Sequence, residues 1–227
     1  MPVVVAFVSQ KGGVGKTTLA RALGAVAAHA GLNVLIGDLD YHQRTASRWE
    51  ETRREHDIKP VLHVETFASV ADALDAADGY ELLILDAPGG ANAATLDIAR
   101  ASHLVVQPTG PSIDDLFPGV LLFHELVGAG LPRERLALAL CRFLTKDEEK
   151  AARHYIDASE YEALPGSIPE RASYRVAHNQ GRAVTEADDD LDKRADALIE
   201  SLLVRIASAL EQAAEPAQEK DKWSNRR

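Results

Sequence analysis

The chain has 227 residues, of which 46% are hydrophobic and 26% charged, and its formal net charge is −10. This size and composition are typical of one soluble globular domain with a substantial core. The acidic charge excludes a chain-wide attraction to nucleic acid, although not a local basic patch, and the single cysteine, Cys141, excludes disulfide frameworks and clusters held by paired cysteines.

A glycine-rich stretch, SQKGGVGKTT at residues 9–18, directly follows an apolar run that is typical of a strand. Its glycines let the backbone wrap a phosphate and aim N–H groups at the oxygens. Lys16 would bring positive charge to the β- and γ-phosphates, and the Thr17 hydroxyl is placed to bind Mg²⁺. The pattern predicts a phosphate-binding loop, with an ordinary strand-to-helix turn as the alternative. The expected nucleotide contacts are Gly12, Gly13, Val14, Gly15, Lys16, Thr17 and Thr18.

The rest of the chain alternates short apolar strands with helical segments, which is typical of a parallel sheet covered on both faces. After the first strand at residues 3–8, the expected strands are residues 34–37, 62–65, 81–85, 103–107 and 136–140. The expected helices are residues 17–30, 44–55, 70–77, 113–127, 148–161 and 191–212. The sequence therefore predicts an α/β fold, a single domain with a doubly wound, mostly parallel sheet flanked by helices.

The last predicted helix carries an apolar face that fits packing against the sheet. We expect one domain over residues 1–212 and a polar, flexible tail over residues 213–227. The tail has no apolar face, and no apolar run approaches the roughly 20 residues that span a bilayer. A cytoplasmic protein without membrane attachment is therefore expected. The apolar face consists of Leu191, Ala195, Leu198, Leu202, Ile206 and Leu210.

Three aspartates stand where predicted strands end: Asp38 and Asp40 after one strand, and Asp86 after another. In doubly wound sheets, ligands bind at the carboxyl ends of the strands. The run LILDAPGG presents Asp86 as a Walker B motif does, with the carboxylate reaching the Mg²⁺ shell, usually through water. A strand-end turn for Asp86, and a helix-capping role for Asp38 or Asp40, are the alternatives.

The stretch KGGVGKTT resembles the deviant Walker A motif of the ParA/MinD family, a group of P-loop NTPases. The resemblance implies that Lys11 is the signature lysine, which in this family reaches across a nucleotide-sandwiched homodimer to the partner's phosphates. It also implies that Asp40 orients the attacking water and that Asp38 supports the outer shell of the metal. The implied catalytic residues are Lys11, Lys16 and Asp40, and the implied metal-site residues are Thr17, Asp38 and Asp86.

The sequence departs from the family pattern in three places. YHQ at residues 41–43 follows the second aspartate where the family usually has Pro-Gln, and Ala87 replaces a threonine. Cys-Arg at residues 141–142 stands where many relatives carry an asparagine that reads adenine. We therefore expect the base to be held by backbone groups around Pro169 and Glu170, in a loop that resembles the corresponding loop of the family.

The resemblance implies an ATP-driven switch that uses ATP and Mg²⁺ as cofactors and hydrolyses ATP slowly. ATP would hold a homodimer together, the dimer would bind DNA without sequence preference, and a ParB-like, centromere-binding partner would stimulate hydrolysis. Such a protein partitions plasmid or chromosomal DNA and is associated with the nucleoid. The candidate DNA contacts are Lys146, Lys150, Arg153, Arg171, Arg175 and Arg182.

Other functions stay open on the sequence alone. Relatives position carboxysomes or chemoreceptor arrays, and septum-site regulators of the MinD kind share the motif. P-loop ligases of the dethiobiotin or cobyrinate type share the fold but lack the signature lysine. Lys11 therefore argues against a ligase, and the polar tail argues against a membrane-bound regulator.

Overall fold

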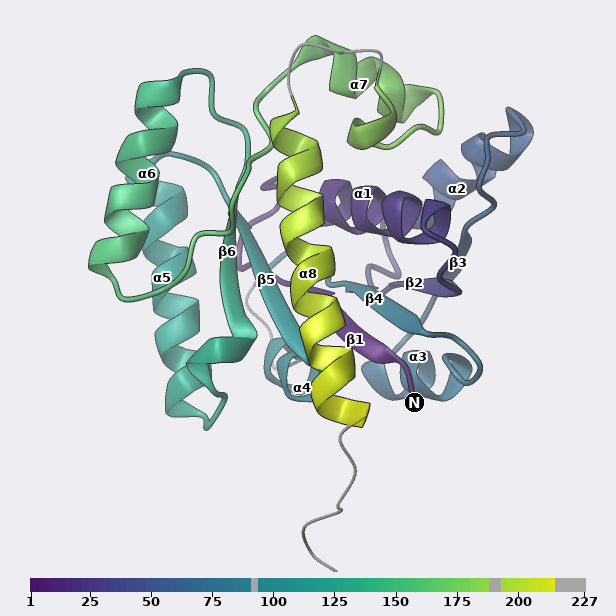
Figure 1. The fold of residues 1–227 in the computed structure, drawn as a ribbon, viewed down its shortest axis with the longest axis horizontal. Helices are drawn as coiled ribbons and strands as arrows, with labels where there is room; N and C mark the ends of the chain where they lie inside the picture. Colours follow the sequence, from purple (N-terminus) through teal and green to yellow (C-terminus); the bar gives the residue numbers. More distant parts are fainter. Residues whose placement is uncertain (91–93, 188–192, 215–227) are drawn as a thin grey trace, which may run out of the picture.

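The computed structural model describes residues 1–90, 94–187 and 193–214. Its centre is a six-stranded sheet in the order β3-β2-β4-β1-β5-β6, and all of the paired strands are parallel (Figure 1). This confirms the predicted doubly wound α/β fold. The strands are β1 (Val3–Phe7), β2 (Val34–Asp38), β3 (His63–Thr66), β4 (Leu82–Asp86), β5 (Leu104–Thr109) and β6 (Leu136–Leu140).

Helices cover both faces of the sheet. Buried side chains place α1, α2, α7 and α8 on one face, and α3, α4, α5 and α6 on the other. None of the helices in the described parts of the chain is long and apolar enough to cross a membrane. The helices are α1 (Lys16–His29), α2 (Thr45–Glu55), α3 (Val70–Ala76), α4 (Ala94–Ala101), α5 (Ile113–Gly128), α6 (Lys146–Ala158), α7 (Ala172–Asn179) and α8 (Arg194–Ala214), with short 3₁₀ helices η1 (Arg133–Arg135) and η2 (Val184–Glu186).

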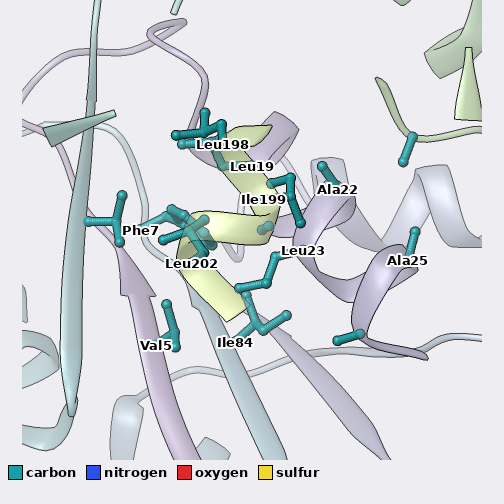
Figure 2. Close-up of a cluster of buried hydrophobic side chains, with 14 of the residues drawn as sticks. Val5, Phe7, Leu19, Ala22, Leu23, Ala25, Ile84, Leu198, Ile199 and Leu202 are labelled. Carbon is teal, nitrogen blue, oxygen red and sulfur yellow. The ribbon is translucent and has the colours of Figure 1, made fainter. Parts of the chain in front are cut away.

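The core on the α1 side is built by alternation along β1 and by the apolar stripes of α1 and α8. Val5 and Phe7 point to this face because side chains alternate along a strand. They belong to one buried cluster with Leu19 of α1 and Leu198 and Leu202 of α8 (Figure 2). The predicted apolar face of the last helix is therefore confirmed where it is described; Leu191 and the side chain of Leu210 lie outside the described residues.

Several element boundaries differ from the prediction. Helix α6 covers Lys146–Ala158 rather than residues 148–161, because Thr145 and Glu148 form a capping box that starts it earlier. It ends earlier because Glu160 adopts a φ of 60°. Helices α4 and α7 were not predicted, and α8 continues to Ala214, into the segment expected as a tail. The rest of that segment lies outside the described residues.

The chain after α6 returns alongside β6 and so brings a distant loop to the glycine-rich loop. The Leu138 N–H donates to the Glu162 carbonyl at 2.8 Å, and the Ile168 N–H donates to the Leu140 carbonyl at 2.9 Å. The Arg142 N–H then donates to the Ile168 carbonyl at 2.7 Å. These bonds place residues 168–170 at the carboxyl edge of the sheet, where β1 ends.

Candidate nucleotide-binding site

The glycine-rich loop turns sharply between β1 and α1. Gly13 and Gly15 have φ angles of 72° and 118°, which strain residues that carry a Cβ. Lys16 begins α1, is buried, and donates from Nζ to the carbonyl of Lys11 at 3.2 Å. Burial lowers the pKa of Lys16, while the charges of Asp86 and Asp40 oppose that shift. The loop thus holds a desolvated cation beside carboxylates.

Asp86 ends β4 directly beside this loop and is 2% exposed. Burial raises its pKa to about 7, although a hydrogen bond from the Thr17 side chain and the charge of Lys16 favour the ionised form. Its Oδ1 atom is buried and has no hydrogen-bond partner in the described residues. A buried carboxylate oxygen without a partner, next to a threonine hydroxyl, fits an oxygen-preferring cation such as Mg²⁺.

The described residues contain no group of three or more His, Cys, Asp or Glu side chains that could hold a metal by themselves. Mg²⁺ is commonly held by one or two protein groups together with substrate phosphates and water. Thr17 and Asp86 therefore suit a metal that arrives with a nucleotide rather than one kept in a protein cage.

Asp38 is fully buried at the end of β2 and accepts hydrogen bonds at both carboxylate oxygens. Oδ2 accepts from the N–H groups of Ala46 and Ser47, at 3.0 and 3.2 Å, and Oδ1 accepts from the N–H of Asp40 at 3.1 Å. Burial raises the pKa of Asp38, and these hydrogen bonds oppose the shift. Asp38 thus ties the start of α2 to the sheet; its contribution to the outer shell of a metal stays a prediction.

Asp40 lies in the loop between β2 and α2 and is half-buried. Its Oδ1 accepts from the Gln43 N–H at 3.0 Å, and its carbonyl accepts from the Arg44 N–H at 2.8 Å. The charge of Asp40 acts on Lys16, so the two charged groups lie near each other. Its water-orienting role stays a prediction.

Lys11 is paired within its own subunit. Its Nζ donates to Asp115 Oδ1 of α5 at 2.9 Å, and its side chain is 40% exposed. The N–H of Lys11 donates to the Ser9 hydroxyl at 3.1 Å, which fixes the backbone at the start of the loop. The signature lysine is therefore accessible and engaged by a partly exposed carboxylate.

A cavity of about 400 Å³ opens between the glycine-rich loop and the segment that returns along β6. The segment with Pro169 and Glu170, which the sequence predicts to hold the base, lines the same cavity as the glycine-rich loop, and its base-binding role stays a prediction. The cavity-lining residues in the two walls include Gly13, Gly15, Lys16, Thr17 and Thr18 on one side, and Ile168, Pro169, Glu170, Arg171, Tyr174, Arg175 and His178 on the other.

Sequence reasoning missed several residues of this cavity. Arg142 donates from Nη1 to the Gly13 carbonyl at 2.9 Å and approaches Glu170 Oε2 with Nε at 3.4 Å, so it joins the two walls. Arg21 lines the cavity from α1. A charged residue within an alanine-rich predicted helix was the sequence feature that could have indicated this site residue. His178 lies on α7, which the sequence did not predict, so nothing placed it here.

The candidate DNA contacts do not form one uniform surface. Lys146 and Lys150 are exposed near the start of α6. Arg175 forms an ion pair with Glu170 beside the cavity. Arg153 instead donates to Glu149 and to two backbone carbonyls, of Leu164 and Gly166. The guanidinium of Arg153 thus holds the returning segment to α6, and its role as a DNA contact stays a prediction.

Comparison with known proteins identifies the family of this chain. The family model for the CobQ/CobB/MinD/ParA nucleotide binding domain matches residues 5–193. The carboxysome distribution protein A of Gloeobacter kilaueensis is 37% identical over 127 residues, which cover 56% of this chain and 57% of that protein. The chromosome-partitioning ATPase Soj of Thermus thermophilus is 32% identical over 164 residues, which cover 58% of this chain and 66% of Soj. The chain thus spans less than two thirds of each relative.

Solved structures show the same fold. The cell division ATPase MinD of Pyrococcus furiosus superposes with a TM-score of 0.68 at 19% identity, covering 94% of this chain and 100% of MinD. The ATP complex of Cyanothece McdA(D38A) gives a TM-score of 0.66 at 18% identity, covering 88% of this chain and 96% of McdA. The family model matches most of the chain, and the glycine-rich loop, Lys11 and Asp86 lie at one edge of the sheet. This protein therefore belongs to the ParA/MinD family of nucleotide-binding P-loop proteins.

Proposed function

We propose that this protein is an ATP-driven positioning switch that partitions plasmid or chromosomal DNA. Two copies would dimerise on binding ATP and Mg²⁺, the dimer would bind DNA without sequence preference, and a ParB-like partner would stimulate slow hydrolysis. ParA/MinD proteins are nucleotide-hydrolysing ATPases, so ATPase activity is expected at the level of the family. The observation that carries the proposal is the buried Lys16 beside an Asp86 oxygen that has no hydrogen-bond partner within residues 1–90, 94–187 and 193–214.

The residues of the site have distinct roles in this proposal. The backbone N–H groups of the loop and Lys16 bind the β- and γ-phosphates, while Thr17 and Asp86 would hold the metal. Bound Mg²⁺ supplies charge neutralisation at the phosphates. Asp40 would orient a water for in-line attack, from a position where its charge already acts on Lys16. Positioning and charge stabilisation are most of what such a site contributes, which fits slow turnover.

Lys11 supports the homodimer in this proposal. A lysine that is 40% exposed and paired with a partly exposed carboxylate is available to a second subunit at small cost. Two ATP molecules facing each other would repel, and a lysine from each subunit would offset that repulsion across a two-fold interface. The Lys11–Asp115 pair would then open when the dimer forms.

DNA binding is supported by basic residues near the carboxyl edge and on α6. Lys146 and Lys150 are exposed on α6, while Arg171, Arg175 and Arg182 lie on or beside α7. The net charge of −10 means that this patch must act locally. A dimer would present the patch twice, so DNA affinity should require ATP.

A cargo other than DNA is the main alternative. The relative with 37% identity is named for carboxysome distribution, and the relative with 32% identity for chromosome partitioning, so the two names support different cargoes about equally. A MinD-like regulator is a further alternative. A ligase is less favoured by Lys11.

The experiment that tests the proposal combines two measurements on the full chain. Sedimentation with ATP and Mg²⁺ should reveal a dimer that ADP does not support, and anisotropy of labelled duplexes should reveal DNA binding only with ATP. Dimerisation without DNA binding would favour another cargo. A monomer that neither binds nor hydrolyses ATP would refute the proposal.

A further inference from the structure

One polar corner of the cavity has no role in the proposed function. Arg21 from α1 and His178 from α7 both line the cavity, beyond the residues assigned to the phosphates and the metal. The Arg21 side chain is buried, with the residue only 7% exposed. Arg21 Nε and His178 Nε2 are buried and have no hydrogen-bond partner among the described residues. Since buried polar groups are nearly always paired, these two atoms indicate a polar ligand or water between the helices.

The guanidinium of Arg21 is held in place by its other contacts. Its Nη2 donates to the Thr45 carbonyl at the start of α2, and its plane lies over the Trp49 ring with 5.1 Å between Arg21 Cζ and the ring centroid. Arg53 packs on the same ring at 5.5 Å. Nε, which has no hydrogen-bond partner in the described part of the chain, is therefore held in a fixed orientation.

The end of α7 that carries His178 is also fixed. Trp49 donates from Nε1 to the Arg182 carbonyl at 3.2 Å, and Arg53 donates from Nη1 to the Gly181 carbonyl at 3.1 Å. A Cβ on Gly181 would lie 2.5 Å from the backbone of Arg53, so α2 and the chain after α7 pack closely. Arg21 and His178 thus lie on elements whose separation is set by packing.

The charge of the corner indicates which ligand groups it suits. Burial lowers the pKa of Arg21 to about 10, so it stays charged at neutral pH, and Asp86 and Asp38 balance that charge. Burial and the neighbouring Arg21 lower the pKa of His178 to about 4, so the imidazole is neutral. A neutral imidazole beside an already balanced guanidinium suits hydroxyl groups better than an additional phosphate.

We propose that Arg21 and His178 bind the ribose hydroxyls of the nucleotide, so that the protein prefers ATP to its deoxy forms. This inference rests on the proposed function, which places phosphates at the glycine-rich loop, and on the prediction that the base is held near Pro169 and Glu170. The sugar, which joins the phosphates to the base, would then lie in the cavity that Arg21 and His178 line. A hydroxyl both donates and accepts, so it pairs with the Arg21 N–H and with either tautomer of His178.

The test is a calorimetric titration of the full chain with ATP, 2′-deoxy-ATP and 3′-deoxy-ATP in the presence of Mg²⁺. The wild type should bind ATP about tenfold or more tightly than at least one deoxy form, because that form leaves a buried polar atom unpaired. His178→Phe keeps the ring shape and should reduce the preference towards unity, mainly by weakening ATP. Arg21→Met should do the same if it folds.

His124→Phe is the matched control, because His124 lies on α5 and contacts Tyr161 rather than the cavity. It should keep the preference for ATP. Equal wild-type affinity for all three nucleotides would overturn the ribose assignment while leaving the proposed function intact, and so would a preference that survives in His178→Phe. A wild type that binds none of the three would refute the proposed function and, with it, this inference.

Discussion

Lys11 Nζ lies 2.9 Å from Asp115 Oδ1, so the lysine expected to serve a second subunit is paired within its own. The two side chains are 40% and 26% exposed, and solvent-screened pairs of this kind contribute up to about 1 kcal/mol. Opening the pair is therefore a small cost that ATP-dependent dimerisation can offset.

We expect Asp115→Asn to favour the ATP-dependent dimer, because Lys11 no longer has to leave a carboxylate. Two such pairs open per dimer, so the concentration for half-dimerisation should fall by up to about thirtyfold, measured by sedimentation with ATP and Mg²⁺. Lys11→Ala should bind ATP yet stay monomeric. Asp114→Asn, on the same turn of α5, is the matched control and should behave like the wild type. A dimer in Lys11→Ala would contradict the proposed role of the lysine.

Lys16→Ala should weaken ATP binding by at least about thirtyfold, because the variant leaves the phosphates without their buried cation. Calorimetry of the variant against the wild type measures this loss. Lys150→Ala removes an equal charge from the exposed face of α6 and should bind ATP normally. An unchanged affinity in Lys16→Ala would remove the phosphate-binding assignment.

Asp40→Ala should separate ATP binding from hydrolysis. Loss of a water-orienting carboxylate should slow turnover about 100-fold or more, while the phosphate contacts of the glycine-rich loop persist. The readouts are phosphate release and the lifetime of the ATP-bound dimer. His42→Ala changes an exposed residue of the same loop and serves as the control. Turnover at the wild-type rate would make Asp40 a loop-stabilising residue only.

The site's local motifs were predictable from the sequence because each is contiguous. An apolar run followed by glycines, Lys16 and Thr17 specifies a strand, a turn and a helix start without reference to the rest of the chain. The Walker B strand ending at Asp86 is equally local. The capping box of Thr145 and Glu148 is also local in the sequence, and it predicts the observed start of α6 at Lys146.

Other features could not be predicted because they depend on tertiary packing. Asp115 is far from Lys11 in the chain, so their ion pair follows only from how α5 meets the loop. Arg153 has the spacing of a surface residue, yet carbonyls of the returning segment accept its N–H groups. His178 lies near Arg21 because the returning segment before α7 pairs with β6 and so brings α7 to this edge of the sheet.

His178 should make stability depend on pH. Burial, and then the charge of Arg21, lower its pKa to about 4 from an ordinary value of 6.5. Below pH 6.5 His178 binds a proton in the unfolded chain but stays neutral in the folded chain. The free energy of unfolding is therefore highest above pH 6.5 and falls as the pH decreases towards 4. At pH 5 the loss is on the order of 2 kcal/mol.

Urea denaturation at pH 7 and pH 5 measures this effect. The free energy of unfolding of the wild type should fall more between these pH values than that of His178→Phe, which has no imidazole to protonate. His124→Phe retains His178 and should follow the wild type. Equal falls in the wild type and His178→Phe would show that His178 is not held neutral by the fold.

DNA binding must act through a local basic patch, because the chain is acidic overall. Phosphate contacts release counterions, so affinity should appear with ATP and fall steeply with salt, with a log–log slope of about −0.9 per phosphate contacted on duplex DNA. Arg175→Gln should weaken binding to unrelated duplexes alike and make the slope shallower, without preventing the ATP-dependent dimer.

Arg100→Gln, at the exposed end of α4, is the matched control. Fluorescence anisotropy across a salt series, with and without ATP, measures both quantities. Binding that ignores ATP or salt, or that favours one sequence, would contradict DNA as the surface on which this switch acts.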